Sequence, residues 1–214
     1  MKITKFGHCC LLIEENGMRV LTDPGSYTTA QNDVKNIDVV VITHEHPDHF
    51  HIESIKKILA NNPNVPIITN TAVDALLKKE NITYATVVED GENQEIKGVK
   101  FSGHGTIHAE IHKEWPRVQN TGYMIGERLF YPGDAFHNPK VPVDLLVLPT
   151  GGPWVKISEA IDYAIEVAPK AYFSVHDGGL NERGLGFSRR VAPQILEKHG
   201  IKFIALEIDK ETEI

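Results

Sequence analysis

The sequence predicts an α/β fold, because stretches typical of buried strands are followed by stretches with helical periodicity. The continuous apolar run 39–42 is typical of a buried parallel strand, and apolar residues recur at helical spacing through residues 52–59. The same order recurs in the second half of the chain. There the apolar runs 144–148 and 171–175 lie on either side of a helical pattern at 157–168.

The other elements follow from local signals. Residues 9–13 and 18–22 favour strands, and the Asn16-Gly17 pair between them is a strong hairpin signal because both positions tolerate a positive φ. The second strand ends at Asp23, and we expect Pro24 to restrict Asp23 to extended backbone. His8, which precedes the first strand, is interpreted as a structural residue.

The middle and the end of the chain continue the alternation. The apolar pattern predicts strands at 65–69, 84–88 and 94–96 and a helix at 71–79. It also predicts hairpin strands at 122–125 and 128–131, a helix at 188–199 and a last strand at 201–208, followed by a frayed polar tail from residue 209. No linker of disordered composition divides the chain, so we expect one domain spanning residues 1–214.

The composition limits the class of function. The net charge is −7, from 22 basic and 29 acidic residues, which argues against bulk nucleic-acid binding because such binding needs a basic surface. No apolar run approaches the length of a membrane span, and no apolar signal region follows Met1. The adjacent Cys9 and Cys10 form no disulfide framework and fit a reducing compartment. We therefore expect a cytoplasmic protein.

The motif that carries the chemistry is Thr43-His44-Glu45-His46-Pro47-Asp48-His49, between the strand 39–42 and the helix that follows. Such loops are where α/β sheets place their ligands. His44 and His46 alternate by two, so extended backbone directs both imidazoles to one side. The chain then turns, and Asp48 and His49 face a neighbouring point. One loop can therefore supply half the ligands of two adjacent metal ions.

Further metal-binding residue types follow other predicted strands. Three histidines, His104, His108 and His112, follow the strand that begins at Val99. His104 lies between two glycines, on backbone that is a poor platform for a ligand, whereas His108 follows β-branched residues. Asp134 and His176 each come directly after an apolar strand. These residues are expected at the same edge of a sheet as the motif.

The motif and the order of these residues resemble the metallo-β-lactamase superfamily over essentially the whole chain. The stretch Thr150-Gly151-Gly152-Pro153-Trp154 resembles the small branch related to ascorbate-6-phosphate lactonase. The resemblance implies a four-layer αββα sandwich with two mixed β-sheets inside and helices outside. It favours His108 over His104 and His112 and implies that Asp23 braces the metal loop. The implied metal ligands are His44, His46 and His108 for one ion, Asp48, His49 and His176 for the other, and Asp134 as the bridge.

The resemblance also implies a reaction. We expect a metal-dependent hydrolase with two divalent ions, zinc first, with manganese or iron as alternatives. A dinuclear-metal-bound hydroxide, oriented by the catalytic Asp48, would cleave an anionic ester, lactone or phosphodiester. Two ions, one hydroxide and two carboxylates leave a charge of about +1, which favours a small-molecule anionic substrate. The alternative is a non-hydrolytic metal protein, either an iron oxidoreductase or a metal-binding regulator. Candidates to orient the substrate are His112, Trp115, Trp154, Lys156 and Arg189.

Overall fold

The computed structural model describes residues 1–214, which form two seven-stranded β-sheets and four α-helices. The first sheet has the order β14 (Glu211–Glu213), β1 (Lys2–Gly7), β2 (Cys10–Glu15), β3 (Met18–Thr22), β4 (Val39–Val41), β5 (Ile67–Thr69), β6 (Ala85–Val87). The second has the order β13 (Lys202–Phe203), β12 (Ala171–Val175), β11 (Leu145–Pro149), β10 (Leu129–Tyr131), β9 (Gly122–Ile125), β8 (Val99–His104), β7 (Asn93–Ile96). The helices are α1 (Ile52–Asn61), α2 (Thr71–Lys79), α3 (Ile157–Val167) and α4 (Glu182–Leu196).

Both sheets are mixed, and they share one plan. From β14 to β3 neighbouring strands are antiparallel, and from β3 to β6 they are parallel. In the second sheet the strands from β7 to β10 are antiparallel and those from β10 to β13 are parallel. Four of the parallel pairs, β4–β5, β5–β6, β11–β12 and β12–β13, are connected through helices α1, α2, α3 and α4 in that order. No helix of the structure combines the length and the apolar character needed to cross a membrane.

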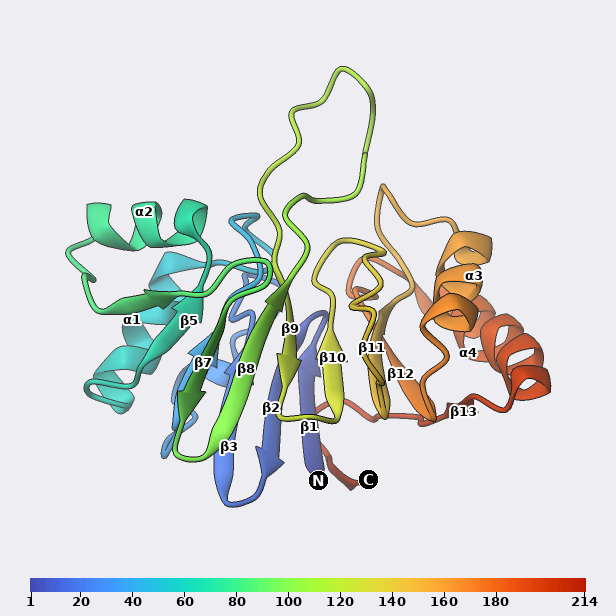
Figure 1. Cartoon of the computed structure of the whole chain (residues 1–214), viewed down its shortest axis with the longest axis horizontal. Helices are drawn as coiled ribbons and strands as arrows, with labels where there is room; N and C mark the ends of the chain where they lie inside the picture. The colour runs from blue at the N-terminus through green and yellow to red at the C-terminus, as the bar shows by residue number, and fades with distance from the viewer.

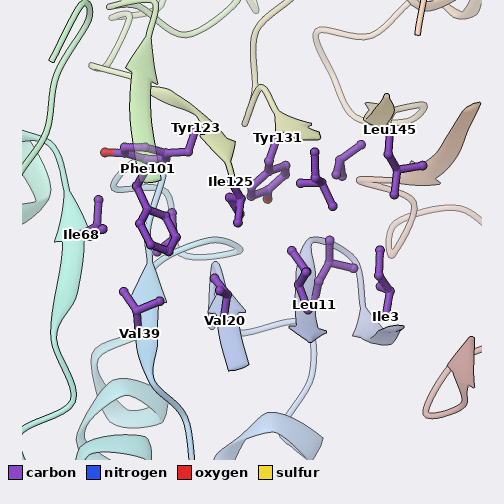
Figure 2. Packing of buried hydrophobic residues seen from close by; sticks show 14 of the residues in the cluster. Ile3, Leu11, Val20, Val39, Ile68, Phe101, Tyr123, Ile125, Tyr131 and Leu145 are labelled. Carbon is purple, nitrogen blue, oxygen red and sulfur yellow. The ribbon is translucent and has the colours of Figure 1, made fainter. Parts of the chain in front are cut away.

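Three groups of buried apolar side chains hold the four layers together. The largest lies between the sheets, where residues such as Leu11 and Val20 of the first sheet face Ile125 and Tyr131 of the second (Figure 2). The second lies between the first sheet and helices α1 and α2, and the third between the second sheet and helices α3 and α4. Figure 1 shows α1 and α2 on one outer side and α3 and α4 on the other. The predicted αββα sandwich is confirmed.

Three predictions about the C-terminal part were wrong. Helix α4 begins at Glu182, not at residue 188, because the Asn181 side chain accepts hydrogen bonds from the N–H groups of Arg183 and Gly184. The tail is not frayed, because Glu211–Glu213 pairs antiparallel with β1. The last predicted strand is reduced to Lys202–Phe203, next to β12.

Candidate metal centre

The candidate ligands meet at one edge of the two facing sheets, because each follows the end of a strand. The loop 43–51 follows β4, and His108 lies in the long loop after β8, which projects from the top of the molecule in Figure 1. Asp134 follows β10, and His176 follows β12. This edge is where open α/β sheets place ligands.

The loop 43–51 ends where helix α1 begins, at Ile52, so Pro47 lies in the loop. The turn at Gly25 packs directly on this loop: a Cβ at Gly25 would lie 1.7 Å from the main-chain oxygen of Asp48. The N–H of Ser26 donates to the Pro47 oxygen (2.9 Å). Only glycine at position 25 permits this close approach.

Four side chains form a first cluster. His44, His46, His108 and Asp134 each place one ligand atom within 4.8 Å of the others. Oδ2 of Asp134 is 3.2 Å from Nε2 of His108 and 3.8 Å from Nε2 of His44. Ligands at about 2.0–2.1 Å from a tetrahedral zinc ion lie roughly 3.3 Å from one another, so this spacing fits an ion.

A second cluster lies on the other side of Asp134. Oδ1 of Asp134 is 3.1 Å from Nε2 of His49, and its Oδ2 is 2.7 Å from Nε2 of His176, without the alignment of a hydrogen bond. Oδ2 of Asp48 is 3.8 Å from Nε2 of His49 and 3.6 Å from Nε2 of His176. Asp134 therefore faces both clusters, and all seven residues predicted from the sequence lie together.

Hydrogen bonds on the far side of three imidazoles determine which nitrogen faces the centre. His49 Nδ1 donates to Oδ2 of Asp23 (2.6 Å), and His108 Nδ1 donates to the main-chain oxygen of Ala109 (2.6 Å). The Thr43 hydroxyl donates to Asp23 (2.7 Å), so it accepts from His44 Nδ1 (3.0 Å). In each neutral ring the lone pair is therefore on Nε2.

Several of these inward atoms have no hydrogen-bond partner. They are His44 Nε2, His49 Nε2, both ring nitrogens of His176 and Asp134 Oδ1, all buried. Buried polar atoms almost always have partners, so such a concentration of unpartnered ring nitrogens and a carboxylate oxygen indicates a site for a cation. The donor set of imidazole and carboxylate suits zinc, manganese or iron. The residues therefore fit a divalent metal centre.

The pKa shifts differ between the two clusters. Burial, together with the neighbouring His49, lowers the pKa of His44 well below its usual value, and burial also lowers that of His46. These two rings are neutral and can bind metal at neutral pH. Burial lowers the pKa of His49 too, but the nearby Asp134 outweighs it and, with no cation present, raises that pKa well above its usual value. Desolvation raises the pKa of Asp134, but the nearby His49, His176 and His44 outweigh it and hold that pKa well below its usual range, so this carboxylate is anionic.

Asp23 is fully buried and holds the metal loop as predicted. Its Oδ1 accepts from the Thr43 N–H (2.8 Å), and its Oδ2 accepts from the Thr43 hydroxyl, from His49 Nδ1 and from the Tyr131 hydroxyl. The predicted backbone was wrong: Asp23 has φ +37°, in the left-handed region, despite the following Pro24. The four hydrogen bonds to the Asp23 carboxylate outweigh the preference of a residue before proline for extended backbone.

His8, which the sequence interpretation treated as structural, lies beside the second cluster. It follows β1, is buried, and its Nε2 lies 3.0 Å from Oδ2 of Asp48. The sequence signal for His8 is the same as for His176, a histidine at the end of a strand. For His8 this signal depends on the strand Lys2–Gly7, which is not predicted from the sequence because polar residues alternate along it.

A buried ion pair supports the loop that carries His176. Lys5 Nζ donates to both oxygens of Asp177 (2.7 Å each) and to the main-chain oxygen of Ser174 (2.9 Å). Lys5 belongs to the first sheet, and Asp177 follows β12 of the second. The pair therefore connects the two sheets next to the metal centre.

His104 and His112, the two alternatives to His108 as a metal ligand, lie outside both clusters. His104 belongs to β8, opposite Gly122, with its ring 5.6 Å from Phe130, and it lines a separate cavity of about 540 Å³. His112 is exposed in the projecting loop, where its Nδ1 accepts from the Glu114 N–H (3.2 Å). The structure therefore favours His108.

Replacing His108 with alanine is expected to reduce metal content, because it removes an Nε2 that faces the first cluster. Loss of a residue that hydrogen-bonds a ligand typically lowers metal affinity 10–100-fold, and loss of the ligand itself should lower it further. Elemental analysis of the purified variant checks this. His104→Ala is the matched control and should retain the metal content of the unchanged protein; equal losses in both variants would contradict the assignment.

A cavity of about 300 Å³ opens over the clusters. Its floor contains His46, Asp48, His108, Asp134 and His176. Apart from Ser26, its rim is formed by apolar and aromatic residues, which are Tyr27, Pro47, Ile111, Pro153 and Trp154. The Trp154 indole N–H donates to Oδ2 of Asp134 (2.9 Å), which fixes the ring beside the floor. Of the residues proposed to orient a substrate, Trp154 lines this cavity, whereas His112, Trp115, Lys156 and Arg189 do not.

Comparisons with known proteins agree with this fold. Protein Rv0786c of Mycobacterium tuberculosis is 33% identical over 196 residues, which are 88% of this chain and 91% of that protein. A UPF0173 metal-dependent hydrolase of Korarchaeum cryptofilum is 28% identical over 78% of each chain. The solved structure of Igni18, a metallo hydrolase of Ignicoccus hospitalis, superposes with a TM-score of 0.78 at 20% identity, and the superposition covers 100% of this chain and 98% of that chain.

A family model described as the beta-lactamase superfamily domain matches residues 2–176. The match begins in β1 and ends at His176, so it includes all seven candidate ligands. The narrower resemblance to the ascorbate-6-phosphate lactonase branch stays a prediction. On the match over residues 2–176 and the shared fold, this chain belongs to the beta-lactamase superfamily domain family.

Proposed function

We propose that this chain is a metal-dependent hydrolase with a dinuclear centre. In this proposal His44, His46 and His108 hold one divalent ion, Asp48, His49 and His176 hold the other, and Asp134 bridges them. The observation that carries it is the set of buried, unpartnered ring nitrogens that surround both oxygens of Asp134. The description of the Korarchaeum relative as a metal-dependent hydrolase supports the same class of reaction.

The bound ions would lower the pKa of water and polarise the substrate at the reacting atom. The orientation of the water depends on the side chains of this chain. Desolvation raises the pKa of Asp48, but the hydrogen bond from His8 and the nearby His49 lower it to about 2. A carboxylate that acidic is a poor general base at neutral pH. Asp48 therefore orients the attacking water and accepts its hydrogen bond, and it does not store the proton.

The size and the lining of the cavity support a class of substrate. A volume of about 300 Å³ is at the small end for ligand pockets and suits a small molecule. The cationic floor favours an anionic or strongly electronegative group, as in an anionic ester, a lactone or a phosphodiester. The rim of Tyr27, Pro47, Ile111, Pro153 and Trp154 favours an apolar substituent next to the scissile bond. The proposed substrate is a compact ester or phosphodiester that carries such a substituent.

Purified protein screened against phosphodiesters, lactones, esters and thioesters tests this function. We expect turnover that is lost on treatment with a chelator and restored by zinc, manganese or iron, because catalysis needs the ions. Ile111→Ala should raise KM for substrates with an alkyl or aryl group, while the exposed Asp162→Asn on α3 serves as the control. Full turnover after complete metal removal would exclude the proposal. Oxygen consumption by iron-loaded protein, without hydrolysis, would favour the oxidoreductase alternative.

A further inference from the structure

His8 contacts two candidate ligands that come from different sheets. Its Nε2 lies 3.0 Å from Oδ2 of Asp48, in the loop after β4. Its main-chain oxygen accepts a hydrogen bond from the N–H of His176 (3.3 Å), directly after β12. The two imidazole rings are 4.2 Å apart between centroids. His8 therefore lies at the junction of the loops that would hold the second ion.

The position of the proton on His8 follows from its other neighbour. The main-chain N–H of Gly178 points at Nδ1 of His8 (3.1 Å). A main-chain nitrogen can only donate, so Nδ1 must be the acceptor and its proton must be on Nε2. The Nε2–H then donates to the carboxylate of Asp48. A charged carboxylate makes this hydrogen bond stronger than a neutral one.

The proton on Nε2 distinguishes between two roles for His8, a metal ligand and a hydrogen-bond donor to Asp48. One ligand atom each of His8, Cys9, His49 and His176 lies within 4.8 Å of the others, so distance alone would allow His8 as a metal ligand. A ring nitrogen that carries a proton has no lone pair for a metal. His8 therefore acts on the centre through Asp48 and does not bind the ion itself.

The surroundings keep the ring in place. The Tyr27 ring packs against His8 with 4.4 Å between ring centroids. A Cβ at Gly178 would lie 3.0 Å from Nδ1 of His8 and 2.7 Å from Cδ2 of Tyr27, so glycine is needed for the contact. His8 itself has φ +49°, a strained conformation that persists only where neighbouring contacts enforce it.

We propose that His8 is a positioning residue that fixes the Asp48 carboxylate toward the second metal ion through its Nε2–H. Oδ2 of Asp48 faces Nε2 of His49 and of His176, and the bond from His8 prevents the carboxylate from rotating away. The inference rests on the proposed function insofar as Asp48 is a ligand of that ion. Outer hydrogen bonds of this kind orient ligands and are typically worth 10–100-fold in metal affinity or activity.

Zinc titration of chelator-treated protein by calorimetry tests this role without an activity assay. In His8→Ala we expect the second zinc ion to bind 10–100-fold more weakly and the first to bind unchanged. In His8→Gln the side-chain amide offers one acceptor and one donor, as the imidazole does, so most of the affinity should return. His8→Asn, whose shorter amide cannot reach Asp48, should resemble the alanine variant and serves if that variant does not fold. His51→Ala, a histidine bonded to Ser54 at the start of α1, is the control.

With a substrate from the screen, kcat should fall in His8→Ala by more than KM changes, because His8 does not line the cavity and the rim loses only the contact between His8 and Tyr27. Unchanged affinity for both ions in His8→Ala and His8→Asn would overturn the proposal. Equal losses in His8→Gln and His8→Ala would also overturn it, since they would make His8 a ligand or a packing residue. Unchanged protein that binds two zinc ions and hydrolyses nothing would contradict the proposed function alone, and the titration would still decide the role of His8.

Discussion

Replacing Asp134 with asparagine is expected to abolish binding of both metal ions and to lower turnover by more than about 100-fold. Asp134 is the one side chain whose two oxygens face both clusters. The amide is nearly the same size but lacks the charge that offsets two cations. Loss of a residue that only hydrogen-bonds a metal ligand typically lowers metal affinity or activity 10–100-fold. Loss of the bridging carboxylate itself should therefore have a larger effect.

Elemental analysis and chelator-sensitive turnover measure this effect. Asp162→Asn, on the exposed face of α3, makes the same chemical change far from the centre and should leave both quantities unchanged. Circular dichroism shows whether the Asp134 variant folds. A folded variant that retains two ions per chain would show that Asp134 is not the bridge.

Replacing Asp23 with alanine is expected to weaken metal binding 10–100-fold and also to destabilise the fold. The carboxylate is fully buried and accepts hydrogen bonds from Thr43, His49 and Tyr131. Removing one partner of a buried charged network typically costs about 3–5 kcal/mol in the free energy of unfolding. The four hydrogen bonds to this carboxylate are the reason to expect a loss of stability as well as of metal affinity.

Urea denaturation of the metal-free protein separates the two effects of Asp23. The metal-free Asp23→Ala variant should unfold at a clearly lower urea concentration with a similar m-value. Asp23→Asn, which retains one acceptor and the side-chain volume, should lie between alanine and the unchanged protein. If Asp23→Ala unfolds at the same urea concentration and binds zinc equally well, Asp23 is only a turn residue.

The part of the centre that was predicted from the sequence rests on local spacing. His44, His46, Asp48 and His49 lie in one short loop, so their order alone identified the chemistry. Asp134 and His176 could be found because each follows a continuous apolar strand, and strand ends meet at one edge. The selection of His108 needed the family resemblance, since three histidines compete after β8.

The remaining features depend on partners far apart in the sequence. β1 was not predicted because its polar alternation becomes a strand only beside β2 and the tail strand β14. The place of His8 depends on β1, and its role depends on Gly178, 170 residues away. The left-handed backbone of Asp23 likewise results from distant hydrogen-bond partners such as Tyr131. Local sequence rules cannot anticipate such contacts.

Anomalous diffraction tests the dinuclear centre most directly. Crystals grown with zinc, and measured above its absorption edge, should show two peaks about 3.5–4 Å apart. One peak should lie among His44, His46 and His108, the other among Asp48, His49 and His176, with Asp134 between them. A single peak, or two peaks that Asp134 does not join, would contradict the account.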